Sequence, residues 1–126
     1  MFRSFLVPET TSRHDGSGPV VEIGEAAGRT MLVTLGITSV IEQESLDVQI
    51  HGSPDGANFA PEPLLAFPQK FYCGTYALVL DLTGRPEIRF LRASWRMKRW
   101  GRGEPTPLFG FYLFAEEAPV AATAVA

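Results

Sequence analysis

The sequence predicts an antiparallel β-sandwich of seven or eight strands, and three observations predict it. Apolar residues recur at every second position in several runs, which is the period of a strand with one buried face. No window longer than one turn shows a helical period. Ten prolines and twelve glycines separate the alternating runs, as turns separate short strands. We expect residues 1–126 to form a single domain, because this length holds one core.

The N-terminal part of the chain predicts three strands. Residues 2–7 are expected to form a strand or an arm, and residues 10–18 a flexible polar loop. A short strand at 20–23 leads through a turn at 25–28 into the stretch 31–37, whose alternation over seven residues predicts a strand.

The middle of the chain contains the clearest strand and turn. Residues 46–51 alternate apolar and polar side chains, which predicts a strand with one buried face and one solvent-exposed face. A turn follows, because Pro54 fixes φ, Asp55 can accept hydrogen bonds from nearby backbone amides, and Gly56 tolerates a positive φ.

The C-terminal half predicts three further strands. Prolines make 61–68 an extended loop, and strands are expected at 76–82 and 88–100, on either side of a turn at 83–86. The last strand, 108–114, is apolar on both sides, which predicts a central position in its sheet.

One segment is strongly basic. Residues 85–102 contain seven basic residues against one acidic residue, Glu87, and therefore carry +6. Because the whole chain carries −3, the remainder carries −9. This acidic remainder would repel phosphate, so we expect no nucleic-acid partner.

Alternation divides the strand at 88–100 into two faces. One face is expected to be buried and includes Trp95. The other face is expected to be exposed and forms the candidate binding surface, which consists of Arg92, Arg96, Lys98 and Trp100. Arg102 extends this surface beyond the strand. These side chains could be a solvated row paired with neighbouring carboxylates, a subunit contact, or a ligand site in which arginine and tryptophan stack on sugars.

Two stretches resemble the discoidin-like, galactose-binding-like jelly roll of carbohydrate-binding modules and phage tail and baseplate proteins. Residues 45–59 read SLDVQIHGSPDGANF, similar to a strand that runs into that family's turn, and residues 89–93 read RFLRA. The resemblance covers about residues 45–95. It implies a jelly roll, and its motifs lie at turns and core positions.

Candidate metal and catalytic groups are sparse. His14 and His51 lack the spaced cysteine or acidic partners of a zinc site. Asp55 could bind calcium, but a calcium ion needs six to eight oxygens and a plain turn is favoured. The lone cysteine, Cys73, is expected to be a buried structural thiol.

The remaining carboxylates do not indicate catalysis either. Glu42 and Glu44 are expected at a solvated strand rim. No nucleophile, phosphate-loop or dinucleotide motif is present in the sequence, so we expect neither an enzyme nor a cofactor.

These observations favour a non-catalytic structural subunit that self-associates into a homo-oligomeric, filamentous or phage-like assembly. The oppositely charged parts of the chain suggest a head-to-tail contact. The apolar N-terminal arm with Phe2 and Phe5, and the Ala/Val-rich tail 118–126, are expected to dock on a neighbour. The alternative is a carbohydrate-binding module that uses Trp100, Arg96 and the loop at 58–59. A lone cysteine and no run long enough to span a membrane predict a cytoplasmic or particle-bound protein without a membrane partner.

Overall fold

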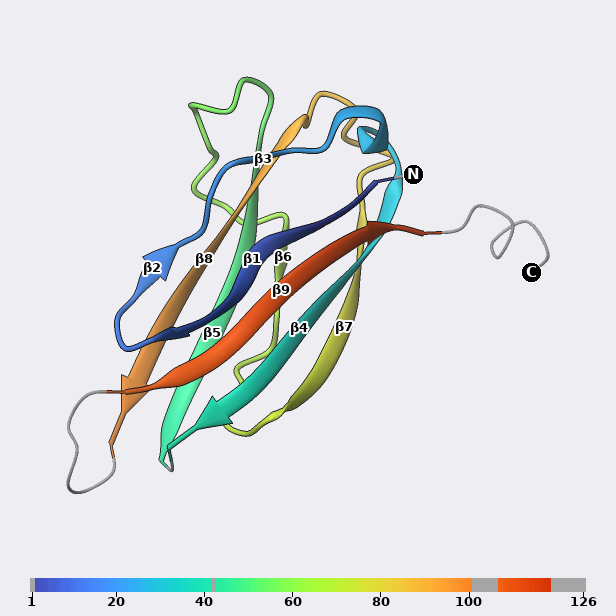
Figure 1. Cartoon of the computed structure of the whole chain (residues 1–126). Coiled ribbons are helices and arrows are strands. Elements are labelled where there is room, and N and C mark those ends of the chain that lie inside the picture. Colours follow the sequence, from blue (N-terminus) through green and yellow to red (C-terminus); the bar gives the residue numbers. More distant parts are fainter. Residues whose placement is uncertain (1, 42, 101–106, 119–126) are drawn as a thin grey trace.

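The computed structural model describes residues 2–41, 43–100 and 107–118, which form two facing antiparallel sheets (Figure 1). In chain order the elements of this part of the chain are β1 (Arg3–Ser12), β2 (Gly16–Ser17), β3 (Val21–Glu22), the 3₁₀ turn η1 (Gly24–Ala26), β4 (Thr30–Val40), β5 (Glu44–Ser53), β6 (Leu65–Ala66), β7 (Gly74–Asp81), β8 (Phe90–Arg99) and β9 (Phe109–Glu117). Sheet A has the order β1-β9-β4-β7. Sheet B has the order β2-β8-β5-β6, and β3 also pairs with β8. The predicted all-β sandwich is confirmed.

The strands pair in the order of a jelly roll. The first strand pairs with the last, β4 pairs with β7, and β5 pairs with β6, so the chain is one long hairpin rolled into two sheets. Both β2 and β3 pair with β8, where Gly16 lies opposite Trp95 and Val21 opposite Leu91. The described residues contain nine strands, more than the predicted seven or eight. Counting β2 and β3 as one interrupted strand gives the eight strands of a jelly roll.

The N-terminal strand differs from its prediction in length and in role. It pairs with β9 from Arg3 to Ser12, so the loop predicted at 10–18 begins only after Ser12. Backbone hydrogen bonds to β9 hold this polar stretch, although its side chains are mostly exposed. Phe2 packs partly buried against the core. The expected N-terminal arm is therefore a strand in the sheet of its own chain.

The core lies between the two sheets, and β4 and β9 each supply four of its buried apolar side chains. Phe109 and Phe111 are its largest fully buried side chains, and β9 lies between β1 and β4, the central position that its sequence predicts. Strand β5 contributes Leu46, Val48 and Ile50 from the facing sheet. Alternation directs every second side chain outward, so each sheet also has an outer face on which a site can form. The described residues contain no helix with the length and apolarity that a membrane span requires.

Candidate functional site

The predicted binding row on β8 does not form one surface. Arg92 donates hydrogen bonds to Ser17 Oγ at 2.8 Å and to the Gly18 carbonyl at 3.2 Å. It therefore holds the β2–β3 segment onto β8. Arg102 lies outside the described residues. Arg96 and Lys98 remain together on the outer face of sheet B.

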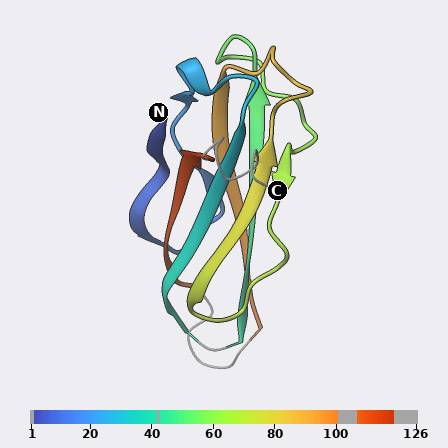
Figure 2. The same ribbon diagram turned by 90° about the vertical axis from the view of Figure 1, so that its right-hand side faces the viewer.

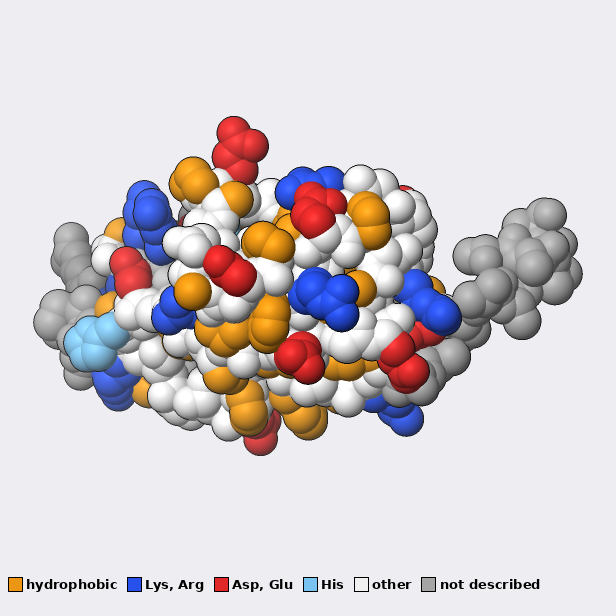
Figure 3. Space-filling view, turned by 90° about the horizontal axis from the view of Figure 1, so that it is seen from above, with side chains coloured by type: hydrophobic (Ala, Val, Ile, Leu, Met, Phe, Trp, Pro, Cys, Tyr) orange, Lys and Arg blue, Asp and Glu red, His pale blue; other side chains and the backbone are white. Residues whose placement is uncertain are grey.

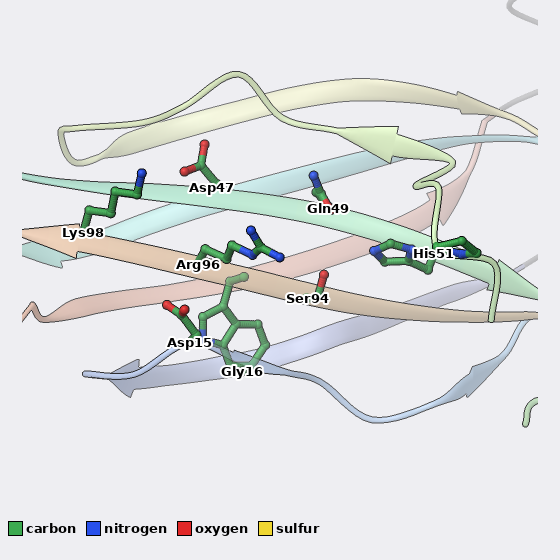
Figure 4. Close-up of a pocket in the computed structure, with 10 residues that line it drawn as sticks. Asp15, Gly16, Asp47, Gln49, His51, Ser94, Arg96 and Lys98 are labelled. Carbon is green, nitrogen blue, oxygen red and sulfur yellow. The ribbon is translucent and has the colours of Figure 1, made fainter. Parts of the chain in front are cut away.

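Arg96 and Lys98 line a polar trough of about 650 Å³ on sheet B (Figure 4). Its residues come from β2, β5, β8 and two connecting segments, namely Asp15, Gly16, Asp47, Gln49, His51, Pro61, Ser94, Trp95, Arg96 and Lys98. Acids, bases, an amide and a hydroxyl therefore meet in one hollow. Successive same-face residues of a strand lie about 6.8 Å apart, so the trough is long enough for an extended ligand.

Cross-strand pairs form the floor of this trough. Asp47 lies opposite Arg96, and Gln49 lies opposite Ser94. Asp47 accepts a hydrogen bond from Gln69 Nε2 at 3.2 Å. Within the described residues, neither Arg96 nor Lys98 has an ion pair or hydrogen bond of its own. Two cations are thus available to a ligand, beside carboxylates that would accept hydroxyl hydrogens.

The wall of the trough is fixed by the segment before β2. Trp95 Nε1 donates to the His14 carbonyl at 3.0 Å, and the backbone N–H of Met97 donates to Asp15 Oδ1 at 2.7 Å. The Trp95 ring also meets Phe111 edge-on, with centroids 5.2 Å apart. Trp95 is therefore half-buried against the core, close to its prediction, and its outer edge borders the trough.

Trp100 is 58% exposed, as its position predicts, but it lies outside the trough. It meets Phe71 edge-on at a centroid distance of 6.1 Å, and Tyr72 lies beside Phe71 at 6.4 Å. A hollow of about 410 Å³ at these aromatic residues is lined also by Val40 and Gln43. Trp100 and Arg96 therefore belong to different surfaces.

The outer face of sheet A is apolar, in contrast to that of sheet B. We call the following residues the apolar face: Phe5, Leu32, Val79, Tyr112 and Phe114. Two apolar cross-strand pairs lie on this face, since Phe5 lies opposite Phe114 and Leu32 lies opposite Val79. The polar residues Thr34 and Glu116 lie beside them, opposite Phe114 and Leu32. The Phe5 ring meets those of Phe114 and Tyr112 at 5.0 and 6.1 Å. The sequence indicates Phe5 as part of an arm but does not reveal its four partners, because alternation alone does not show which strands are neighbours.

Two single residues differ from their predictions. Cys73 is exposed, so the prediction of a buried thiol is wrong. Glu44 is 1% exposed, so the predicted solvated rim is also wrong there. Its carboxylate accepts the backbone N–H groups of Ile41 and Leu108. Glu42 lies outside the described residues.

The predicted turn at 52–56 is present, with Gly56 at φ 79°. The Asp55 carboxylate accepts hydrogen bonds from the backbone N–H groups of Asn58 and Ala57 and from the side chains of Asn58 and Ser53. These bonds, the one from the Asn58 backbone first, hold the pKa of Asp55 far below its ordinary value. Donors thus occupy both carboxylate oxygens, and the described residues contain no cluster of three or more potential metal ligands at this turn or elsewhere.

Charge on the molecular surface is mixed. In Figure 3, which views the sandwich from above, Lys and Arg side chains alternate with Asp and Glu, and hydrophobic side chains gather between them. Part of the basic segment is also used internally, since Arg85 pairs with Glu87 at 2.7 Å. The opposite charges of the sequence therefore do not form two separate patches at this end.

No protein-family model matches the chain, and no curated protein matches its sequence. Among solved structures, the crystal structure of SPBc2 prophage-derived protein YomS matches with a TM-score of 0.49 and 7% sequence identity. The match covers 92% of this chain and 96% of that chain.

Proposed function

We propose that this protein is a non-catalytic structural subunit that self-associates through sheet A. The observation that carries the proposal is the apolar face, on which Phe5 is 47% exposed and Val79 60% exposed. Phe5, Leu32 and Val79 lie on three different strands of one sheet, so exposed apolar side chains occur on both halves of its width. A group of large exposed apolar side chains on one face indicates an interaction site.

The size of the apolar face suggests weak association by itself. Complete burial of a large apolar side chain contributes about 1.5–3 kcal/mol, so these partly exposed residues contribute roughly 1 kcal/mol each. Five of them give roughly 5 kcal/mol before the entropy of association is subtracted. A stable assembly therefore needs a further contact beside this face.

Analytical ultracentrifugation from micromolar to millimolar protein tests the proposal. We expect a mass above the 13.8 kDa monomer that rises with concentration and changes little with salt, because the contact is apolar. Phe5→Glu and Leu32→Glu should each shift the equilibrium toward monomer, since a charge would lose its water in the contact. Gln49→Glu, on the outer face of sheet B, is the matched control and should associate like the wild type. A wild-type protein that stays monomeric throughout contradicts the proposal.

The polar trough supports a second candidate, carbohydrate binding. Arg96 and Lys98, which make no ion pair with any described residue, lie there beside carboxylate, amide and hydroxyl groups. This combination suits a hydroxyl-rich ligand that both donates and accepts hydrogen bonds. A glycan array followed by calorimetry tests it. Arg96→Ala should abolish binding, while Trp100→Ala should leave it intact, because Trp100 lies outside the trough. An array without a saturable signal excludes this candidate.

A further inference from the structure

The two edge strands of sheet A differ in how they are protected. Strand β1 carries Pro8, the charged residues Arg3 and Glu9, and two register shifts against β9. These are the features that prevent a sheet edge from pairing with another chain. Strand β7 has none of them before its last residue, Asp81, and it pairs with β4 over eight consecutive residues without a shift.

Strand β7 is also the longest edge strand without such protection among the described residues, since the longer edge strand β1 carries it. The outer strands of sheet B, namely β2, β3 and β6, are two residues long each. Figure 2 faces the side of the sandwich where β7 lies, and β7 is the last strand of sheet A on that side. The backbone groups on the outer side of β7 have no strand partner in the described part of the chain. An apolar edge of this length is a template for strand pairing.

We propose that β7 pairs antiparallel with β7 of a second copy, across a two-fold axis, and joins the two A sheets into one. This inference rests on the proposed self-association and adds an edge contact at β7 to the contact at the apolar face. A second copy suits this edge because an antiparallel pair of identical strands is self-complementary by symmetry. The backbone hydrogen bonds supply the further contact that the apolar face requires.

The side chains select a register for this pairing. Residues that lie opposite one another must point to the same face of the joined sheet. The two-fold axis must therefore pass midway between one residue and the same residue of the second copy. An axis at Leu78 places Ala77 opposite Val79 and Thr75 opposite Asp81, and it leaves Gly74 outside the pairing. No like charges then face one another, and all seven remaining residues of β7 are paired.

This arrangement also enlarges the apolar face. Leu32 lies opposite Val79 within one copy, and Val79 would lie opposite Ala77 of the second copy. The two apolar faces therefore become continuous across the joint on one side of the joined sheet.

Cysteine cross-linking of the full chain tests the register. In a Cys73→Ser background, the variants Ala77→Cys and Val79→Cys are mixed and oxidised. Directly opposite residues of an antiparallel pair have Cα atoms about 4.5–5.5 Å apart, within disulfide range, whereas diagonal neighbours are about 7–8 Å apart. We expect a disulfide dimer from the mixture and from the double variant, and little from either single variant alone. Gln49→Cys, on the outer face of sheet B, is the control and should remain uncross-linked.

The outcomes separate this inference from the proposed function. Oligomers that form without a cross-link between positions 77 and 79 overturn the β7 pairing but leave self-association intact. Strong self-cross-linking of Ala77→Cys alone shows another register and overturns the axis at Leu78. A wild-type chain that is monomeric at all concentrations overturns both. Circular dichroism of each variant verifies that it is folded before oxidation.

Discussion

Replacement of Glu44 by glutamine is expected to destabilise the fold although the two side chains have nearly the same shape. Glu44 is 1% exposed at the start of β5. Its Oε2 accepts the backbone N–H of Ile41 at 3.0 Å, and its Oε1 accepts that of Leu108 at 2.9 Å. One carboxylate thus connects the turn after β4 to the segment that enters β9, and so connects both sheets.

The magnitude follows from these two hydrogen bonds. A hydrogen bond to a charged group contributes about 1.5–3 kcal/mol, and an unpaired buried N–H costs a similar amount. Glutamine keeps one acceptor oxygen but places its NH₂ group against the second N–H. The relief of carboxylate desolvation offsets part of the loss. We therefore expect Glu44→Gln to lower the free energy of unfolding by about 2 kcal/mol, and Glu44→Ala by about 4 kcal/mol, because alanine loses both bonds and leaves a cavity.

Urea denaturation followed by tryptophan fluorescence measures this loss. The midpoint should fall while the m-value stays constant, because the surface exposed on unfolding does not change. Glu62→Gln is the control, since Glu62 is exposed and makes no hydrogen bond or ion pair with any described residue. Its effect should stay within about 0.5 kcal/mol. If Glu44→Gln is as mild as this control, the carboxylate does not connect the sheets as described.

Two further variants test packing and a turn. A Cβ at Gly52 would lie 2.5 Å from Leu64 Cδ1, so Gly52→Ala should lower the free energy of unfolding by about 1–3 kcal/mol, measured by thermal unfolding. Gly84→Ala is the control and should be nearly neutral, because a Cβ at Gly84 would meet no atom within 4 Å. Equal effects would contradict this close packing. Asp55→Ala should lower the melting temperature at pH 7. Hydrogen bonds to the Asp55 carboxylate depress its folded-state pKa, so the ionised group stabilises the fold fully above its unfolded pKa, and this stabilisation is lost as the pH falls toward the folded-state pKa. The difference from wild type should shrink below about pH 4, and a constant difference down to pH 2 would refute the assignment.

The sequence could predict those parts of the fold that depend on local alternation. Residues 46–51 and 76–82 read as strands because every second side chain is apolar, and both are strands in the structure. The turn at 52–56 was predictable because proline, aspartate and glycine each favour it for a separate physical reason. Local patterns also placed Trp100 at the surface.

The rest depends on which strands become neighbours, and alternation contains little of that information. Arg92 is used internally because β2 lies beside β8, and Glu44 is buried because residue 108 approaches it from a strand far along the chain. The apolar face combines residues of four strands, β1, β4, β7 and β9, whose order in the sheet follows from the rolled hairpin. The candidate site could therefore be found only in part, through Phe5, Arg96 and Lys98.

The two sheets suggest how the two proposed functions would combine. Pairing of β7 about a two-fold axis perpendicular to the sheet places both apolar faces on one side of the dimer and both polar troughs on the other. Two troughs that point the same way can hold neighbouring sites of one polymer, which strengthens binding without any new contact. Face-to-face packing of the A sheets would instead direct the troughs in opposite directions, and no single extended ligand could then reach both. The affinity for a long polymer relative to its short fragment thus distinguishes an edge-paired dimer from a face-packed one.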